Sequence, residues 1–414
     1  MNGMNAHQMT QAGRTAHGEQ RTIGSRLGAS VRETTDSVGK LRIPELVLGF
    51  FFIFEGSLFG IPVPFNQVAV VALILLSVTR RYRYDISRSQ WALLLLGLGV
   101  LYVCAVSMTS DPSEFAADWK RRAIRLALMI VFIGVTASGR IDFRSLITGI
   151  GVGSLVNAVA FYLGVAPDTY GGVLSGWFGD KNVAGLGYAI YGLLAVSVVQ
   201  KKSSKVCVFL IFGLLVWFTG SRTSIAGYVS AGGWILLAPR LPVIGRWLLG
   251  VVIWIGVLVM SEDYSRIGVF SDRTGSDQLR ARIDRASEAK VGQSGFFGEG
   301  LGEAYIVFPS DPNKTWFFHN SYWSALVEGG WPWLLILLIV TIVVCLRPFT
   351  CELTATQVIG QALAITLVVC SWRLGEVLFT LQWALAVAFA MRGSAVAPAQ
   401  LGQDAAIVSE SEIR

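Results

Sequence analysis

The sequence predicts an all-α polytopic membrane protein with about twelve transmembrane helices and one large loop outside the membrane. Hydrophobic residues make up 53% of the 414-residue chain and charged residues only 15%, which is unlike soluble globular proteins. The hydrophobic residues also gather in runs of roughly 15 to 25, close to the length with which a helix crosses a bilayer. Because these runs lack the alternation of barrel strands, helices are the predicted spanning elements.

Two polar tails flank this predicted membrane domain. Residues 1–40 contain several arginines and no hydrophobic core, so they are interpreted as a disordered cytoplasmic tail rather than a signal peptide. Residues 392–414 are interpreted as a second, short cytoplasmic tail. Residues 41–391 then form one membrane-embedded domain, which includes the large outer loop at residues 261–320.

The orientation follows from the charges of the short loops. The candidate spans are residues 44–61, 65–79, 91–108, 121–138, 143–163, 182–199, 205–219, 223–239, 243–261, 321–346, 355–371 and 374–391. The connecting segments RRYRYDISR, SGRIDFR, QKKSSK and APRLPVIGR fall on one side, whereas IPVPFN on the other side is uncharged. By the positive-inside rule, the basic loops and both termini are cytoplasmic.

One predicted outer segment, SDPSEFAADWKRRAIR, does not follow this rule. It places Lys120, Arg121, Arg122 and Arg125 on the outer side. Either the fourth span is displaced or these side chains extend to the interface; alternatively, they face an anionic ligand at the outer surface.

The five cysteines predict neither disulfides nor a zinc site. None lies in a predicted outer loop, and none is near a second Cys or His at metal-ligand spacing.

Arg222 lies at a tight predicted outer turn, WFTGSRTSIAG. It could anchor the membrane interface or cap helix carbonyls. Alternatively, its small polar neighbours leave its forked donors available for a phosphate. A second candidate anion site is GWFGDKNVAG, where Lys181 and Asn182 begin a span. The simpler interpretation there is that Asp180 or Asn182 caps the helix.

The large loop predicts an amphipathic helix followed by a glycine-rich turn. Between Gln278 and Lys290, hydrophobic residues recur at helical spacing, and Arg280 and Arg282 lie among the charged residues between them. A solvated face with an Arg280–Asp284 pair is the alternative. The following GQSGFFGEGLG suits a loop whose amides approach a ligand closely. No strand precedes it, so a dinucleotide fold is not predicted.

His319, in TWFFHNSYWSALVEGG, is the one histidine outside the N-terminal tail. Its ring could accept a proton near neutral pH as a general base, and Asn320 could cap the next span. The alternative is an interfacial histidine held by a carbonyl among belt aromatics.

These motifs together resemble the O-antigen ligase and polymerase family, the Wzy-like transferases of bactoprenol-linked glycans. The family pattern is F-x-x-x-N, then S-R-T/G, then an Arg-led helix ending in G-x-G, then H-N-x-Y-x-x-x-x-x-E-x-G. The matching segments here are FGDKN (178–182), SRT (221–223), LRARIDRASEAKVGQSGFFGEG (279–300) and HNSYWSALVEGG (319–330). The resemblance covers nearly all of the chain from about residue 44.

The resemblance implies a GT-C-like, metal-independent glycosyltransferase of the bacterial inner membrane, with its active site on the extracytoplasmic side and no cofactor. Family members move a glycan from undecaprenyl pyrophosphate to a hydroxyl of an acceptor glycan or lipid. By this resemblance His319 would be catalytic, and Arg222 with Arg280 or Arg282 would bind the pyrophosphate. Asp284 stands where the family helix often carries a Trp, which leaves the choice between the two helix arginines open.

The chain's own motifs add Lys181, Asn182 and Asn320 as substrate-binding candidates. Expected partners are the lipid-linked donor, the hydroxyl acceptor and the bilayer, with a chain-length regulator or flippase as further candidates and no nucleic acid.

Two other functions are also compatible with the sequence. A flippase or transporter of lipid-linked sugars would also have many spans, and Glu55 is its candidate ion-coupling carboxylate, although a paired interface position is simpler. A metal-dependent glycosyltransferase would need an outer carboxylate such as Asp180, Glu299 or Glu303, but no DxD-like pair stands in an outer loop.

Overall fold

The computed structural model describes residues 41–57, 63–262 and 274–395. The predicted tail at residues 1–40 lies outside the described residues, as do residues 396–414 of the second tail and residues 263–273 of the large loop. The domain boundaries therefore stay predictions.

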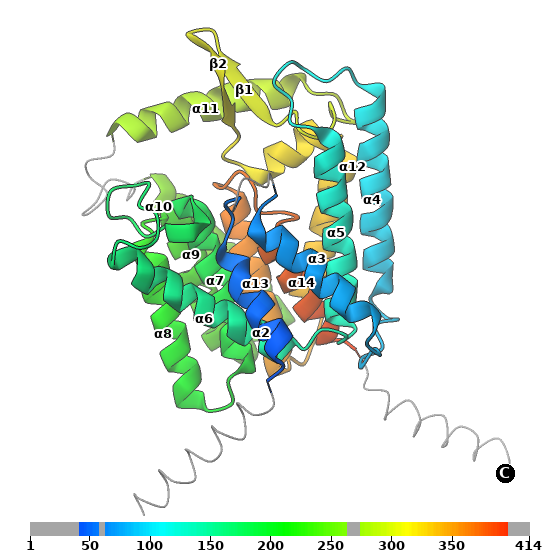
Figure 1. The fold of residues 1–414 in the computed structure, drawn as a ribbon, viewed down its shortest axis with the longest axis vertical. Helices are drawn as coiled ribbons and strands as arrows, with labels where there is room; N and C mark the ends of the chain where they lie inside the picture. Colours follow the sequence, from blue (N-terminus) through cyan, green and yellow to red (C-terminus); the bar gives the residue numbers. More distant parts are fainter. Residues whose placement is uncertain (1–40, 58–62, 263–273, 396–414) are drawn as a thin grey trace, which may run out of the picture. The chain divides into compact units, whose positions relative to one another are not determined.

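The described part of the chain is mostly helical (Figure 1). Its helices are α2 (Ile43–Phe50) with the 3-10 turn η1 (Phe51–Ile53), α3 (Phe65–Val78), α4 (Gln90–Thr109), α5 (Trp119–Ala137), α6 (Phe143–Tyr162), α7 (Lys181–Val198), α8 (Lys202–Phe218), α9 (Arg222–Leu237), α10 (Val243–Glu262), α11 (Thr274–Gln293), α12 (Ser321–Ile339) with the π-helix η5 (Val340–Leu346), α13 (Ala355–Ser371) and α14 (Leu381–Arg392). The short 3-10 turns η2 (Gly176–Phe178) and η3 (Ala238–Arg240) precede α7 and α10.

Each candidate span corresponds to one of these helices, but their lengths differ. Within the described residues, four helices are long and apolar enough to cross a membrane: α4, α6, α7 and α12 with η5. Shorter apolar helices include α3, α10, α13 and α14. This composition is consistent with an all-α membrane protein, whereas the twelve-span topology stays a prediction.

The first and last candidate spans differ most from the observed helices. The helical segment that begins with α2 ends at Ile53, and α14 begins at Leu381 instead of residue 374. Residues 372–380 instead form a turn between α13 and α14, which we call the α13–α14 turn.

α12 also contains a kink that the sequence reading did not predict. Gly329 and Gly330 leave the helical conformation, and Gly330 has a φ of 64°. A Cβ at Gly330 would overlap the carbonyl oxygen of Phe296. Glycine is therefore required here both by the backbone conformation and by the close approach of the glycine-rich loop.

A layer of α11 and two antiparallel strands, β1 (Tyr305–Phe308) and β2 (Asp311–Phe317), lies over one end of the helical bundle (Figure 1). We call this the hairpin end. The amphipathic helix predicted at residues 278–290 is confirmed as part of α11, and its hydrophobic face buries Ile283 against Ile306, Phe318 and Val327. This burial holds α11 and the hairpin on the start of α12.

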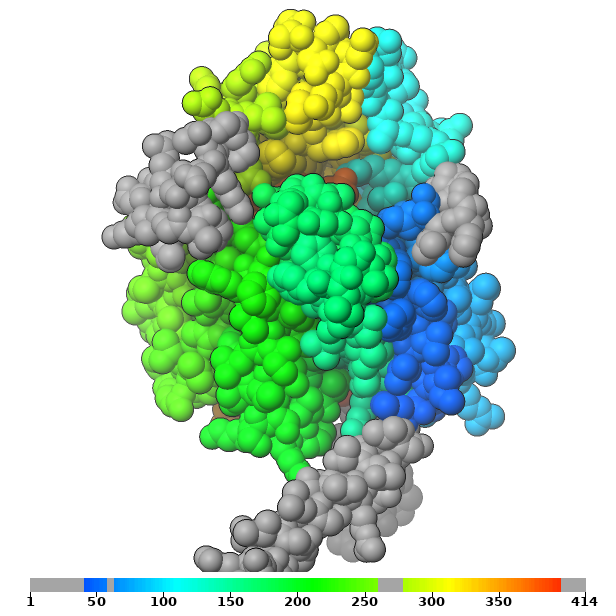
Figure 2. Space-filling model, turned by 60° about the vertical axis from the view of Figure 1, so that its left-hand side comes forward, coloured from blue at the N-terminus to red at the C-terminus, as the bar shows by residue number. Residues whose placement is uncertain are grey.

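The α4–α5 connection lies beside the hairpin (Figure 2). The backbone N–H of Leu301 donates to the Ser107 hydroxyl at 2.8 Å, and the N–H of Ser113 donates to the Glu303 carboxylate at 2.9 Å. The glycine-rich loop is thus attached to α4 as well as to α12.

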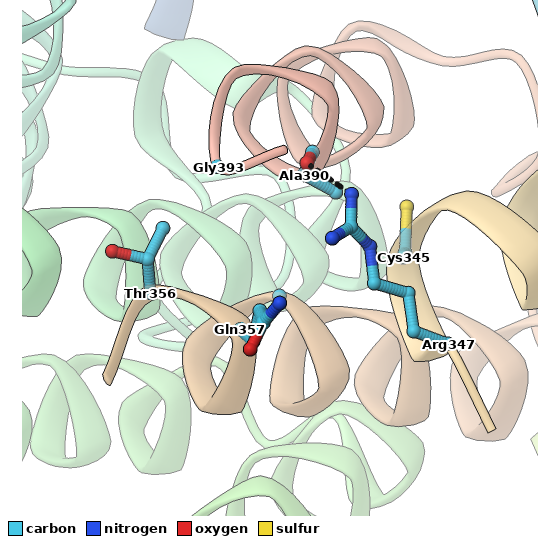
Figure 3. Close-up of a pocket in the computed structure, with 7 residues that line it drawn as sticks. Cys345, Arg347, Thr356, Gln357, Ala390 and Gly393 are labelled. Carbon is cyan, nitrogen blue, oxygen red and sulfur yellow. Dashed lines mark hydrogen bonds between the residues drawn. The ribbon is translucent and has the colours of Figure 1, made fainter. Parts of the chain in front are cut away.

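The opposite end of α12 contains a small cavity beside Arg347 (Figure 3). The Arg347 guanidinium donates to the carbonyl oxygen of Ala390 at 3.2 Å. The cavity measures about 10 Å³, at most the room of one water molecule. It is therefore no candidate for a substrate site.

The predicted orientation can be tested with thiol labelling. Asn313→Cys, on exposed β2, is expected to react with a membrane-impermeant maleimide in intact spheroplasts, while the native Cys351, exposed between η5 and α13, reacts only after the membrane is broken. Labelling of Cys351 in intact spheroplasts, with residue 313 protected, would contradict the predicted orientation.

Candidate functional site

His319 lies between β2 and α12 at the hairpin end, and its neighbour Asn320 begins α12. The Asn320 side-chain oxygen accepts hydrogen bonds from the N–H groups of Tyr322 at 3.0 Å and Trp323 at 3.3 Å. This confirms Asn320 as the N-cap of α12. Asn320 is also only 5% exposed. Because its side-chain oxygen is used by the cap, a substrate contact would have to come from its side-chain nitrogen, and this contact stays a prediction.

The backbone around His319 rests on the α13–α14 turn. The Ser321 hydroxyl donates to the carbonyl of Leu374 at 2.7 Å and accepts from the N–H of Val377 at 3.0 Å. A Cβ at Gly375 would overlap the carbonyl oxygen of Phe318. The position of His319 therefore depends on a turn that lies more than 50 residues farther along the chain.

The electrostatic environment of His319 lowers the pKa of its imidazole to about 4. Burial is the largest cause, because it penalises the charged ring. Arg280 lowers the pKa further, and Asp180 opposes both effects. The ring is thus neutral at pH 7, with a pKa well below the near-neutral value that the sequence reading expected.

Arg280 and Arg282 of α11 have different surroundings. Arg282 is exposed, and its guanidinium lies 4.7 Å from the centre of the Phe308 ring. Arg280 is half-buried and is close enough to His319 to lower its pKa. Of the two candidate pyrophosphate ligands on α11, Arg280 is therefore the one that shares surroundings with His319.

Asp284, which stands where the family helix often carries a Trp, links α11 to the α13–α14 turn. Its carboxylate lies 3.4 Å from the Arg373 guanidinium. Burial raises the pKa of Asp284, and Arg373 and Arg280 oppose this rise. Asp284, which departs from the family pattern, thus forms an ion pair that joins α11 to the α13–α14 turn.

The first turn of α7 is capped as predicted. One carboxylate oxygen of Asp180 accepts from the N–H of Asn182 at 2.7 Å and of Val183 at 3.1 Å, and the other accepts from the Tyr170 hydroxyl. The Lys181 ammonium lies 5.2 Å from the centre of the Tyr170 ring. Lys181 and Asn182 are half-buried at the helix start, where an anion would be favoured.

Arg222 is the first residue of α9, next to the first turn of α7. A Cβ at Gly185 would lie within 3 Å of the Ser221 and Ser224 side chains, so the two helix starts touch. The Cys370 thiol lies 3.9 Å from the carbonyl of Thr223, which brings the start of α9 against the end of α13. Because α13 leads into the turn that contacts Phe318 and Ser321, on either side of His319, the start of α9 and His319 both lie at the hairpin end.

Arg122 has ion-pair partners that the sequence reading did not anticipate. Its guanidinium lies 2.9 Å from the Glu328 carboxylate and 2.8 Å from the Glu376 carboxylate. Arg121 is 76% exposed and pairs with Asp118 at 3.4 Å. Of the basic cluster at the start of α5, Arg122 thus points inward to two acids.

The pairing of Arg122 could not be read from local patterns, because Glu328 is 206 residues away. The available signals were the basic run at the start of α5, which departs from the positive-inside rule, and the acidic residue in HNSYWSALVEGG.

The acids that the sequence offers as candidate metal ligands have other contacts. Glu299 and Glu303 each lie 3.6 Å from the Lys290 ammonium, and Asp180 caps α7. Among the residues that the structure describes, no group of three or more His, Cys, Asp or Glu side chains is arranged to hold a metal ion.

The low pKa of His319 can be measured directly, because the chain has only three histidines. In a His7→Gln, His17→Gln variant with a histidine-free tag, the ¹³Cε1 NMR signal of His319 is expected to titrate with a pKa of about 4. The reason is the burial of the ring beside Arg280. A midpoint near the unperturbed value of about 6.5 would mean that the ring is hydrated and that this description of the site is wrong.

No family model matches the chain, and no curated protein matches it. The resemblance to the O-antigen ligase and polymerase family therefore depends on the four motifs alone, and the activity that it implies is a proposal.

Proposed function

We propose that this protein is a membrane glycosyltransferase of surface-polysaccharide assembly. It would move a glycan from undecaprenyl pyrophosphate to a hydroxyl of an acceptor glycan or lipid at the outer face of a bacterial cell membrane. The observation that carries the proposal is the gathering of Arg222, Arg280 and a neutral His319 at the hairpin end. Four helices that could cross a membrane support the membrane setting.

The pyrophosphate would bind where the starts of α7 and α9 touch. At the start of α9, where Ser221 makes no side-chain cap, the N–H groups favour an anion, and Arg222 at the first position adds a forked cationic donor. Arg280 on α11 supplies a second guanidinium on the side of His319. Together these groups would stabilise the negative charge that develops on the leaving oxygen.

The transfer step balances without any further reactant. The oxygen of the acceptor hydroxyl attacks the anomeric carbon of the donor sugar, the bond from that carbon to the pyrophosphate oxygen breaks, and the bonding electrons leave with the pyrophosphate. His319 takes the proton from the attacking hydroxyl. Such general-base assistance typically contributes about 10²- to 10⁴-fold to the rate.

With an imidazole pKa of about 4, His319 can act as a general base only when the donor is bound. Without an anion, the imidazole is neutral and ready to accept a proton, but it is a weak base. A pyrophosphate beside the ring would favour the protonated form and raise the pKa. The donor itself would therefore strengthen the base at the moment when it is needed.

Substitution of the gathered residues tests the proposal. His319→Ala and Arg222→Ala are each expected to reduce surface glycan by about 100-fold or more, because each removes a group that acts on the transition state. Arg280→Ala is expected to lose more activity than Arg282→Ala, since Arg282 faces Phe308. Glycan is measured by gel electrophoresis of cell-surface polysaccharide.

The matched control is Arg121→Ala, which removes the same charge from an exposed residue of α5 and is expected to leave glycan within about twofold of the wild type. Membrane levels of all variants are compared by immunoblot. Normal glycan in His319→Ala at wild-type protein levels would remove His319 from the proposed mechanism.

A further inference from the structure

Three separate elements meet at the guanidinium of Arg122. Arg122 lies in the first turn of α5, Glu328 lies in α12 just before its kink, and Glu376 lies in the α13–α14 turn. One terminal nitrogen of Arg122 donates to Glu376 at 2.8 Å, and the other donates to Glu328 at 3.1 Å. A forked donor is needed to hold two carboxylates in this way.

The two ion pairs differ in burial. The Glu328 side chain is 6% exposed and the Arg122 side chain 22% exposed, whereas Glu376 is 56% exposed. Glu328 also accepts a hydrogen bond from the N–H of Gly302 at 3.1 Å. The Arg122–Glu328 pair is therefore a buried anchor, and Glu376 is the arm that joins the α13–α14 turn to it. The positive charge of Arg122 accordingly lowers the pKa of Glu376 below its usual value.

This arm holds the part of the turn that supports His319. Gly375, next to Glu376, packs against the carbonyl of Phe318, and its own carbonyl accepts from the Ser324 hydroxyl at 3.2 Å. Leu374 and Val377 share the Ser321 hydroxyl. Residues 374–377 thus contact the chain on both sides of His319.

A cavity of about 20 Å³ lies between the ion pairs and the His319 segment. Arg122, Glu328, Glu376, Gly375 and Phe318 are among its lining residues. It has room for about one water molecule. The Arg122–Glu376 ion pair borders this space and links α5 to the turn beside it.

We propose that Arg122 is a positioning residue for His319, which holds the α13–α14 turn against residues 318–321 through Glu376 while Glu328 anchors it to α12. The consequence for glycan transfer depends on the proposed function. There, loss of the arm would slow the chemical step rather than weaken donor binding, because Arg222 and Arg280 would still bind the pyrophosphate.

Glu376→Gln is the most informative variant, because it removes the negative charge of the exposed arm and leaves the buried Arg122–Glu328 pair intact. Arg122→Gln would leave Glu328 buried without a counter-charge, which can prevent folding. Arg122→Lys is the second variant: it keeps the charge but loses the fork that holds both carboxylates. The matched controls are Arg121→Gln on α5 and Glu352→Gln, an exposed acid between η5 and α13.

The first readout is the pKa of His319, measured by NMR in the protein that lacks His7 and His17. If the turn loosens, water reaches the ring, and the pKa is expected to rise by about one unit or more in Glu376→Gln and in Arg122→Lys. The controls are expected to leave it unchanged. An unchanged pKa in both test variants would overturn the positioning role, whether or not the protein transfers glycans.

The second readout is the kinetics of transfer by the purified protein. Glu376→Gln is expected to lower kcat by about 10- to 100-fold with little change in KM, since misplacement of a catalytic group by about 1 Å can have that effect. An equal loss in Arg121→Gln, or a rise in KM alone, would contradict the inference. Should the wild type form no glycosidic bond, the proposed function fails, and the pKa comparison still decides the positioning role.

Discussion

The hydroxyl of Ser321 donates to Leu374 and accepts from Val377, and this double hydrogen bond joins the two parts of the chain on which the site depends. On one side of it is the segment that carries His319 and the capped start of α12. On the other side is the α13–α14 turn, which Arg122 and Arg373 connect to α5 and α11. A neutral hydroxyl is well suited to this buried position, because it satisfies one donor and one acceptor of the backbone without a charge.

The same region balances an unusual number of charges. Asp180 is used by the cap of α7, Asp284 by Arg373, and Glu328 and Glu376 by Arg122. His319 is held neutral among them by burial and by Arg280. In the proposed reaction this order is useful, because the acids hold the scaffold while the positive end of α9 meets the incoming pyrophosphate.

The sequence predicted most helix positions well, because a run of hydrophobic residues and its flanking caps are local properties. Asn320 is predicted as a cap from its position before a span, Asp180 is one of two predicted cap residues for α7, and the amphipathic face of α11 follows from its spacing. The two-stranded hairpin escaped prediction, since its edge at residues 311–314 is polar and exposed. The start of α14 at Leu381, instead of residue 374, was not predicted either, because residues 374–380 form a turn that contacts Phe318 and Ser321.

The remaining differences come from long-range packing. The kink at Gly330 depends on the approach of Phe296, and the pairing of Arg122 joins residues 206 positions apart. The pKa of His319 depends on how deeply its ring is buried, which no local motif encodes. Fold class and candidate residues were thus accessible from the sequence, whereas the arrangement that relates those residues was not.

The most direct test of the central claim is to incubate the purified, reconstituted protein with its radiolabelled undecaprenyl-pyrophosphate-linked glycan and a hydroxyl acceptor in excess EDTA, and to measure new glycosidic bonds. We expect bond formation with release of undecaprenyl pyrophosphate. Movement of the labelled lipid across the vesicle membrane without a new bond would contradict a glycosyltransferase and favour a flippase.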